Sequence, residues 1–283
     1  MALPFVQAQL VSRELLTPFL GIFTFSSDSP ITFKSGQFLT VGITHPRLEG
    51  PGVMFQQNMN IVWRPYSVAS APGDNYIELL ISWVRQDGKR RDEWGTLTTE
   101  LFNPDPDIRY FFRKKAKGVF LLPEDDRDVI MVAAGTGIAP FMSMLRNAQT
   151  EGDRRRFVLI HGSSSREGLA YRGELQQDFH LGLTYLCAVS REEGGDFGKR
   201  YVEDFFLNRP GDSGRLTAEE TASLIRSGAA SETKIEQILG IPPDPRRFVM
   251  MLCGNAGMIG NVKAIASSCG FTFRKDLFTE EYW

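Results

Sequence analysis

The stretch VIMVAAGTGIAP at residues 129–140 decides the fold. Its first six residues are apolar without alternation, which is typical of a strand buried on both faces of a parallel sheet. Gly135, Thr136 and Gly137 follow at once, and Pro140 suits the first turn of a helix, where no N–H is needed. A strand, a glycine turn and a helix in this order present backbone N–H groups to an anionic ligand. Because Pro140 stands where the common dinucleotide motif has its third glycine, a glycine turn without a ligand is the alternative.

The same texture continues toward the C-terminus. Nearly continuous apolar runs predict buried strands at residues 157–160, 183–189 and 248–253, and helical patterns occupy residues 140–149, 171–179, 218–226 and 257–268. Thr217 and Glu220 have the spacing of a capping box before the third helix. Strands that alternate with helices predict an α/β half with a parallel sheet and right-handed crossovers.

A second loop repeats the pattern of the first. Cys253, Gly254 and Asn255 end the last predicted strand and precede the last predicted helix. Both loops are then expected at the carboxyl ends of parallel strands, where open sheets bind ligands. A small buried hydrophobe is the alternative for Cys253, because a lone cysteine most often has that role.

The N-terminal part has a different texture. Short β-type segments, such as residues 21–25, 37–41 and 77–84, are separated by Gly, Pro, Asn and Asp, which predicts an antiparallel barrel or sandwich. The polar segment at residues 123–127 separates the two textures. We therefore expect two domains, a β-barrel at residues 1–123 and an α/β domain at residues 128–283. Residues 191–213 have few helix or strand signals apart from those at residues 201–207, and they are expected to form a partly ordered surface insertion.

Within the β part, Arg64, Pro65, Tyr66 and Ser67 place a cation, an aromatic ring and a hydroxyl close together. In an extended segment Arg64 and Tyr66 share one face, with Ser67 at the neighbouring position. Such a wall suits a ligand that carries both phosphate and a flat ring. A plain strand with an exposed Arg and a half-buried Tyr is the alternative.

Composition excludes several classes of function. The chain has 283 residues, a net charge of −2 and a pI near 6.0, which gives no overall attraction to nucleic acid. Its three cysteines, without a C-x-x-C spacing, argue against a disulfide framework, a metal site or an iron–sulfur cluster. No apolar run is long enough to span a bilayer. A soluble cytoplasmic protein is the expectation.

Four motifs together resemble the ferredoxin/flavodoxin–NADP+ reductase family in its bacterial form. They are Arg64-x-Tyr66-Ser67, Gly135-Thr136-Gly137-x-x-Pro140, Leu252-Cys253-Gly254-Asn255 and Glu280-x-Tyr282-Trp283, in family order across nearly the whole chain. The resemblance implies an N-terminal antiparallel β-barrel that binds FAD and a C-terminal α/β domain that binds NADP(H). It implies an enzyme that exchanges hydride between NADP(H) and FAD and single electrons with a small carrier protein.

The resemblance also implies which residues bind FAD. Arg64 is expected to pair with the diphosphate, because guanidinium is always charged and forked. Tyr66 is expected to stack on the isoalloxazine ring, and Ser67 to hydrogen-bond near flavin N5. The other implied FAD-binding residues are Pro65 in the same motif, Gly95 and Thr98 in a second diphosphate loop, Tyr282 over the ring face opposite Tyr66, and Trp283 on the adenine. Taken alone, Gly95 and Thr98 are typical of a helix cap, and Tyr282 and Trp283 of a frayed end.

NADP(H) is implied to lie on the α/β domain. Gly135, Thr136, Gly137, Pro140, Gly254 and Asn255 form the two loops that cradle it. The family places Cys253 beside the nicotinamide and Glu280 near it, so that Ser67, Cys253 and Glu280 are the expected catalytic residues; Glu281 competes with Glu280 for that place. Ser190, Arg191 and Arg215 resemble the clamp for the 2′-phosphate, although either Arg taken singly is typical of a solvated surface charge.

The chain departs from the bacterial pattern at one position. Ser164 stands where many members have an Arg, and Arg166 follows two positions later. The clamp therefore depends on whether Arg166 takes over. His161 is expected to be structural.

Two basic runs are candidates for docking an acidic ferredoxin or flavodoxin. The first holds Arg109, Arg113, Lys114, Lys115 and Lys117, and the second is residues 154–156. They are equally compatible with solvated faces. We expect a monomer with no nucleic-acid or membrane partner. The rival functions are an NADH-using flavin reductase component of an oxygenase or similar system, and a non-catalytic flavin-binding subunit.

Overall fold

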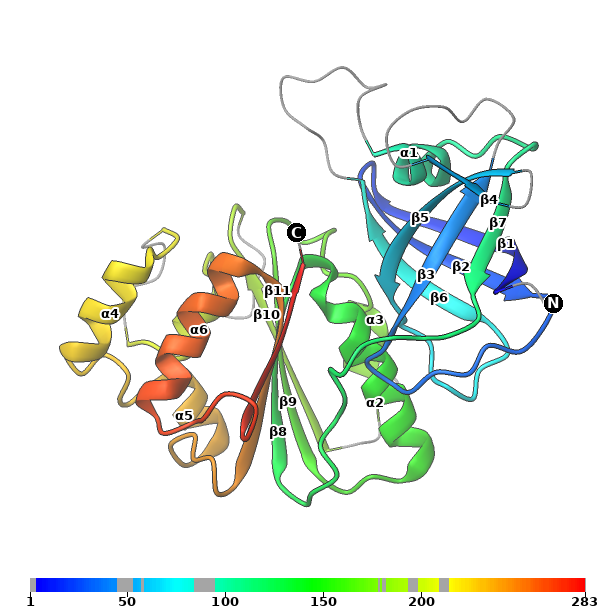
Figure 1. Cartoon of the computed structure of the whole chain (residues 1–283). Helices are drawn as coiled ribbons and strands as arrows, with labels where there is room; N and C mark the ends of the chain where they lie inside the picture. The colour runs from blue at the N-terminus through cyan, green and yellow to red at the C-terminus, as the bar shows by residue number, and fades with distance from the viewer. Residues whose placement is uncertain are drawn as a thin grey trace. The chain divides into compact units, whose positions relative to one another are not determined.

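The computed structural model describes residues 4–44, 53–56, 59–83, 95–177, 179, 182–192, 198–208 and 214–282. It divides into two compact units (Figure 1). Unit 1 holds Met1–Leu122 with Ala139–Asn147, and unit 2 holds Pro123–Ile138 with Ala148–Trp283. Trp283 lies outside the described residues, and so does its predicted contact with adenine.

Unit 1 is built on a seven-stranded antiparallel sheet in the order β4-β5-β3-β7-β1-β2-β6. Its elements are β1 (Phe5–Thr17), β2 (Leu20–Ser27), β3 (Phe38–Thr44), β4 (Val53–Gln56), β5 (Met59–Ser67), β6 (Ile77–Ser82), α1 (Thr96–Phe102) and β7 (Arg109–Arg113). The sheet curls around a core that includes Phe23, Phe25 and Phe112, all without solvent exposure. Just after β5, the N–H of Ala69 donates to the Glu78 carbonyl at 2.8 Å, which brings the end of β5 to β6. The predicted antiparallel β fold is confirmed, although the strand ladder does not close fully into a barrel.

Proline is accommodated in β5 because of where the strand pairs. Strand β4 pairs with β5 only as far as Val62, whereas β3 pairs with β5 from Val62 to Ser67. Pro65 therefore lies beyond the part of β5 that has a partner on both sides. A residue without an N–H is tolerated at such an edge.

Part of helix α2 (Ala139–Glu151) is held by unit 1. The Ser143 hydroxyl donates to the Ser70 carbonyl at 2.7 Å, and Arg146 donates to Glu78 at 2.7 Å and to the Ala69 carbonyl at 2.9 Å. From the sequence, this helix is expected to lie wholly in the α/β domain. These polar contacts, which join residues far apart in the sequence, are the reason that Ala139–Asn147 groups with the β unit instead.

Unit 2 contains a five-stranded parallel sheet in the order β10-β9-β8-β11-β12. Its strands are β8 (Asp128–Ala134), β9 (Arg156–Ser163), β10 (Gly182–Val189), β11 (Phe248–Asn255) and β12 (Leu277–Tyr282). Its helices are η2 (Gly135–Ile138), α3 (Arg172–Gln177), η3 (Val202–Phe205), α4 (Ala218–Arg226), α5 (Lys234–Leu239) and α6 (Ala256–Ser268), with α4, α5 and α6 together on one side of the sheet (Figure 1). The predicted parallel-sheet α/β fold is confirmed, and so is the capping box of Thr217 and Glu220.

The predicted surface insertion is wrong for its described part. Val202, Phe205 and Leu207 are at most 4% exposed and belong to the core of unit 2. Glu203 and Asp204 between them are each 2% exposed. The segment packs against α6 through these apolar side chains, so its scattered Gly and Pro residues misled the sequence-based prediction.

The second basic run is not a free basic face. Arg155 pairs with Asp153 at 2.6 Å and donates to the Pro123 carbonyl, and Arg156 donates to the Ile238 carbonyl near the end of α5. Arg155 and Arg156 are therefore engaged within unit 2, while Arg154 is exposed, and docking by this run stays a prediction. None of the helices in the described ranges has the length and hydropathy of a membrane span.

Candidate functional site

The strand order reverses between β8 and β11, and both predicted ligand loops lie at this switch point. A Cβ on Gly137 would collide with the Cys253 carbonyl oxygen and lie 2.6 Å from its carbon. Gly254 has φ +152, and a Cβ there would lie 2.9 Å from the Ala134 Cβ. The two loops are therefore packed backbone to backbone. Gly135, at φ +57, faces open space, which leaves room for an anionic ligand at the first loop.

Cys253 and Glu280 are neighbours across β11 and β12. Cys253 is fully buried, and burial, followed by the charge of Glu280, raises its pKa well above the ordinary value, so the thiol stays protonated. Burial raises the pKa of Glu280 to about 7. Among the described residues, Oε2 of Glu280 is buried and has no hydrogen-bond partner. A carboxyl of this kind exchanges a proton readily near neutral pH.

Tyr282 completes this group in unit 2. It lies opposite Asn255 in the β11–β12 register, and its side chain hydrogen-bonds with Cys253. The prediction that Tyr282 covers a flavin ring stays a prediction. Glu281, the competitor of Glu280, is exposed.

Arg215 lies at the start of α6. Its Nη2 donates to Asn255 Oδ1 at 2.8 Å, while the same oxygen accepts from the Met258 N–H at 3.0 Å as the N-cap of the helix. The first turn of α6 holds no acidic residue. A cation at the positive end of a helix is unfavourable without a counterion, so this arrangement suits an anion such as phosphate.

The other predicted clamp residues lie at the ends of β9 and β10. The Ser190 N–H donates to the Ser163 carbonyl and the Arg191 N–H to the Ser164 carbonyl. The backbone N–H of Arg166 binds the Glu192 carboxylate. The structure thus brings Ser190 and Arg191 to Ser163 and Ser164, while the Arg215 guanidinium bonds to Asn255 before α6. A single phosphate held by Arg191 and Arg215 stays a prediction.

The predicted FAD-binding residues in unit 1 lie on two elements in contact. Arg64 and Tyr66 lie on the same face of β5 as Val62, whose side chain belongs to the core. Arg64 is exposed, and its Nη1 donates to the Trp63 carbonyl at 2.8 Å. Helix α1 begins after Gly95, contacts β5, and has the Thr98 hydroxyl donating to the Gly95 carbonyl. Burial raises the pKa of Tyr66, so its ring stays neutral. An exposed, forked cation beside a neutral ring fits a ligand with phosphate and an aromatic system.

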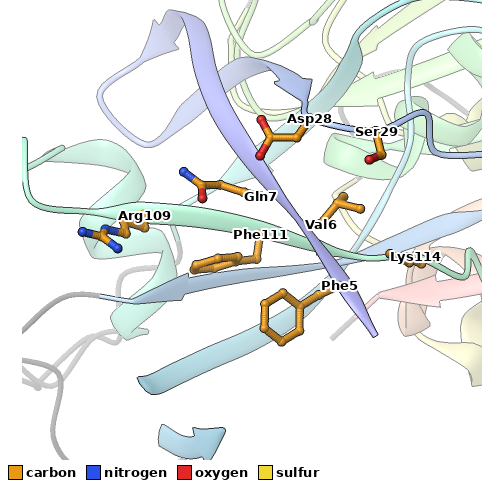
Figure 2. Close-up of a pocket in the computed structure, with 8 residues that line it drawn as sticks. All are labelled: Phe5, Val6, Gln7, Asp28, Ser29, Arg109, Phe111 and Lys114. Atoms are coloured by element: carbon orange, nitrogen blue, oxygen red, sulfur yellow. The ribbon is translucent and has the colours of Figure 1, made fainter. Parts of the chain in front are cut away.

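The outer face of unit 1 carries a pocket of about 460 Å³ (Figure 2). Its lining residues are Phe5, Val6, Gln7, Asp28, Ser29, Arg109, Phe111 and Lys114. Phe5 and Phe111 form its apolar part and pack with Trp63, over which Arg113 lies at 4.0 Å from the ring centroid. None of the motif residues lines this pocket, but two cations of the first basic run do.

Sequence reasoning missed some residues that support these sites. Strand β12, which places Glu280 opposite Cys253, lacks the continuous apolar run of the other parallel strands. Ser143 and Arg146 hold the backbone just after Ser67 from a distant helix, and no local signal could have found them. His161 is fully buried beside the Tyr185 hydroxyl, and burial lowers its pKa to about 4, as expected of a structural residue.

The chain has an antiparallel β unit and a parallel α/β unit with two glycine loops at its switch point, and the comparisons give oxidoreductase as its class. Residues 131–264 match the oxidoreductase NAD-binding domain family. The chain is 26% identical to the ferredoxin–NADP reductase of Azotobacter vinelandii over 234 residues, 81% of this chain and 76% of the relative. It is 29% identical to the flavodoxin/ferredoxin–NADP reductase of Buchnera aphidicola over 179 residues, 61% of this chain and 64% of the relative.

Solved structures share this fold. A ferredoxin NADP+ reductase from Neisseria gonorrhoeae with bound FAD and NADP matches over 100% of both chains, with a TM-score of 0.72 and 23% identity. This match shows a shared fold. The reductase relatives, together with the NAD-binding domain match, confirm the resemblance to the ferredoxin/flavodoxin–NADP+ reductase family that the motifs indicate, and they support an oxidoreductase.

Proposed function

We propose that this protein is an FAD-dependent ferredoxin or flavodoxin–NADP+ reductase. FAD would be held by residues 1–123 and NADP(H) by residues 128–283. The observation that carries the proposal is the buried Cys253–Glu280 pair at the carboxyl edge of the parallel sheet, beside the two glycine loops. When bound, FAD supplies the step between two-electron exchange with NADP(H) and one-electron exchange with a carrier.

The chain's own residues are proposed to bind and orient the cofactors and to hold or release protons. Arg64 supplies charge for the FAD diphosphate, and Tyr66 supplies a neutral ring for stacking. Ser67, 5% exposed at the end of β5, supplies a hydroxyl without adding charge. Cys253 remains a neutral thiol, and Glu280 holds or releases a proton near pH 7.

The anaerobic visible spectrum tests the proposal. We expect a flavin band that NADPH bleaches rapidly and NADH much more slowly. A protein that binds no FAD after reconstitution would contradict the proposal. A flavin that stays oxidised with both nucleotides would favour the non-catalytic flavin-binding subunit.

The enzyme rival is a reductase component of an oxygenase. The ferredoxin reductase in carbazole 1,9a-dioxygenase shares the fold, with a TM-score of 0.63 and 19% identity, so the fold does not separate the two functions. Nucleotide preference separates them, because two or more cations around a 2′-phosphate favour NADPH. Faster bleaching by NADH would favour this rival.

An acidic carrier, ferredoxin or flavodoxin, is the proposed partner of a monomeric enzyme. Arg109, Lys114, Lys115 and Lys117 are exposed, and Lys117 bridges to Phe38, the residue that pairs with Ser67 across β3 and β5. Lys117 of the basic run is therefore two backbone pairings away from Ser67, the residue proposed to lie near flavin N5. The low cysteine count remains the reason to expect a reducing, cytoplasmic setting.

Reversing Lys114 and Lys115 to Glu together should lower the rate of carrier reduction roughly tenfold or more at low salt. The rate should also lose most of its dependence on ionic strength, because the steering field is removed. Stopped-flow kinetics over a salt series measure both. Arg226→Glu with Lys275→Glu, exposed in unit 2, makes the same change in net charge and serves as the control. An unchanged salt dependence would exclude this surface.

A further inference from the structure

Helix α6 presents a glycine where a side chain would displace Arg215. A Cβ on Gly257 would collide with Nη2 of Arg215 and lie 3.2 Å from Cζ. The guanidinium therefore packs against the bare backbone of the first turn, where Nη2 also donates to Asn255. Arg215 and Asn255 are both exposed, so the hydrogen bond alone is a weak restraint. The absence of a side chain at Gly257 leaves space for the guanidinium close to the helix backbone, which favours this one position of the guanidinium.

The backbone beside Arg215 is held by a buried amide on the same helix. Asn261 Nδ2 donates to the Leu216 carbonyl at 3.0 Å and to Glu203 Oε1 at 3.2 Å. Asn261 is 4% exposed and Glu203 2% exposed. Bonds between buried groups of this kind are costly to break, so the position of Leu216 is well defined. Leu216 follows Arg215 in the chain, so Asn261 restrains the backbone from which the Arg215 side chain extends. Asn255 and Gly257 position the guanidinium at the other end of that side chain.

We propose that Gly257 and Asn261 are positioning residues that determine the preference for nucleotides with a 2′-phosphate, through the place they give the Arg215 guanidinium. The inference rests on the proposed function, since it concerns the same NADP(H) site. Charge-assisted bonds from guanidinium to phosphate depend on orientation. NADH has no 2′-phosphate, so displacement of the guanidinium should affect NADPH and spare NADH.

Gly257→Ala tests the proposal with little disturbance to the fold. The group that the new methyl meets is the free end of a flexible side chain, and Ala is a better helix former than Gly. We expect an unchanged or raised Tm and unchanged FAD content. We expect a tenfold rise in KM for NADPH, while kcat and the KM for NADH change less than twofold. Gly260→Ala is the matched control, because nothing lies within 4 Å of a Cβ at that position of the same helix.

A binding measurement without catalysis completes the test. Calorimetry should show adenosine 2′,5′-bisphosphate binding about tenfold more weakly to Gly257→Ala than to wild type, with adenosine 5′-monophosphate unaffected. Asn261→Asp removes the donor to the Leu216 carbonyl and should weaken the bisphosphate in the same direction. If Gly257→Ala keeps wild-type affinity for the bisphosphate, the proposal is overturned. If wild type itself does not discriminate between the two ligands, the proposed function fails first and the variants are not the cause.

Discussion

Arg64→Ala should purify largely without FAD and bind added FAD roughly 30- to 4,000-fold more weakly than wild type. Loss of one charged partner in a hydrogen-bonded charge pair costs about 2–5 kcal/mol, which corresponds to this range. The guanidinium is exposed and donates only to backbone near its own position among the described contacts, so its removal should leave the fold intact. The ratio of flavin to protein absorbance and calorimetric titration with FAD measure the effect.

Arg109→Ala is the control for this experiment. Arg109 is another exposed Arg of unit 1, on β7, away from the motif residues. It should retain full FAD content. Full FAD content in Arg64→Ala would remove the assignment of the β5 motif to the diphosphate.

Glu280→Gln should slow the reduction of flavin by NADPH about 100-fold or more, because a proton-exchanging carboxyl contributes on that scale. The wild-type rate should change with pH around 7, where Glu280 titrates, and the variant should lose this dependence. Stopped-flow measurement under anaerobic conditions from pH 5.5 to about 8.5 checks both. Glu281→Gln, an exposed neighbour, should behave as wild type. Equal effects of both variants would contradict the assignment.

The free energy of unfolding should also depend on pH through the pKa of Glu280. The folded protein raises the pKa of Glu280 from 4.5 to about 7, so between these values the folded state binds more protons than the unfolded state. The resulting stabilisation is fully present below pH 4.5 and is lost as pH rises through 7, a change of roughly 3 kcal/mol. Urea unfolding of wild type, compared with Glu280→Gln across this range, should show that difference.

Most of the fold could be predicted because strands that are buried on both faces of a parallel sheet have continuous apolar sequences. Strands β8 to β11 are confirmed, and α4 has the predicted bounds because a capping box begins it. Helix α5 was missed although Thr233 and Glu236 form the same kind of box. Strand β12 was missed because an edge strand needs few apolar residues, and only its pairing with β11 identifies it.

The site divides in the same way. The residues proposed to contact the ligands, such as Arg64, Gly135 and Cys253, lie in short motifs that the sequence shows directly, and their roles stay predictions. The residues that position them are brought together by folding across long separations. Asn261 and Glu203 are 58 positions apart, and no local pattern predicts their hydrogen bond.

The interlocked glycine loops at the switch point have a consequence for how this enzyme can change. Gly137 and the Cys253–Gly254 backbone leave no room for a side chain, so almost any substitution there disturbs both loops at once. Arg191 and Arg215, by contrast, are exposed side chains. Under the proposed function, selection or engineering can therefore change the dinucleotide preference at Arg191 and Arg215 and leave the two glycine loops as they are. In such an architecture, the nucleotide preference and the redox chemistry of the proposed function can change independently of each other.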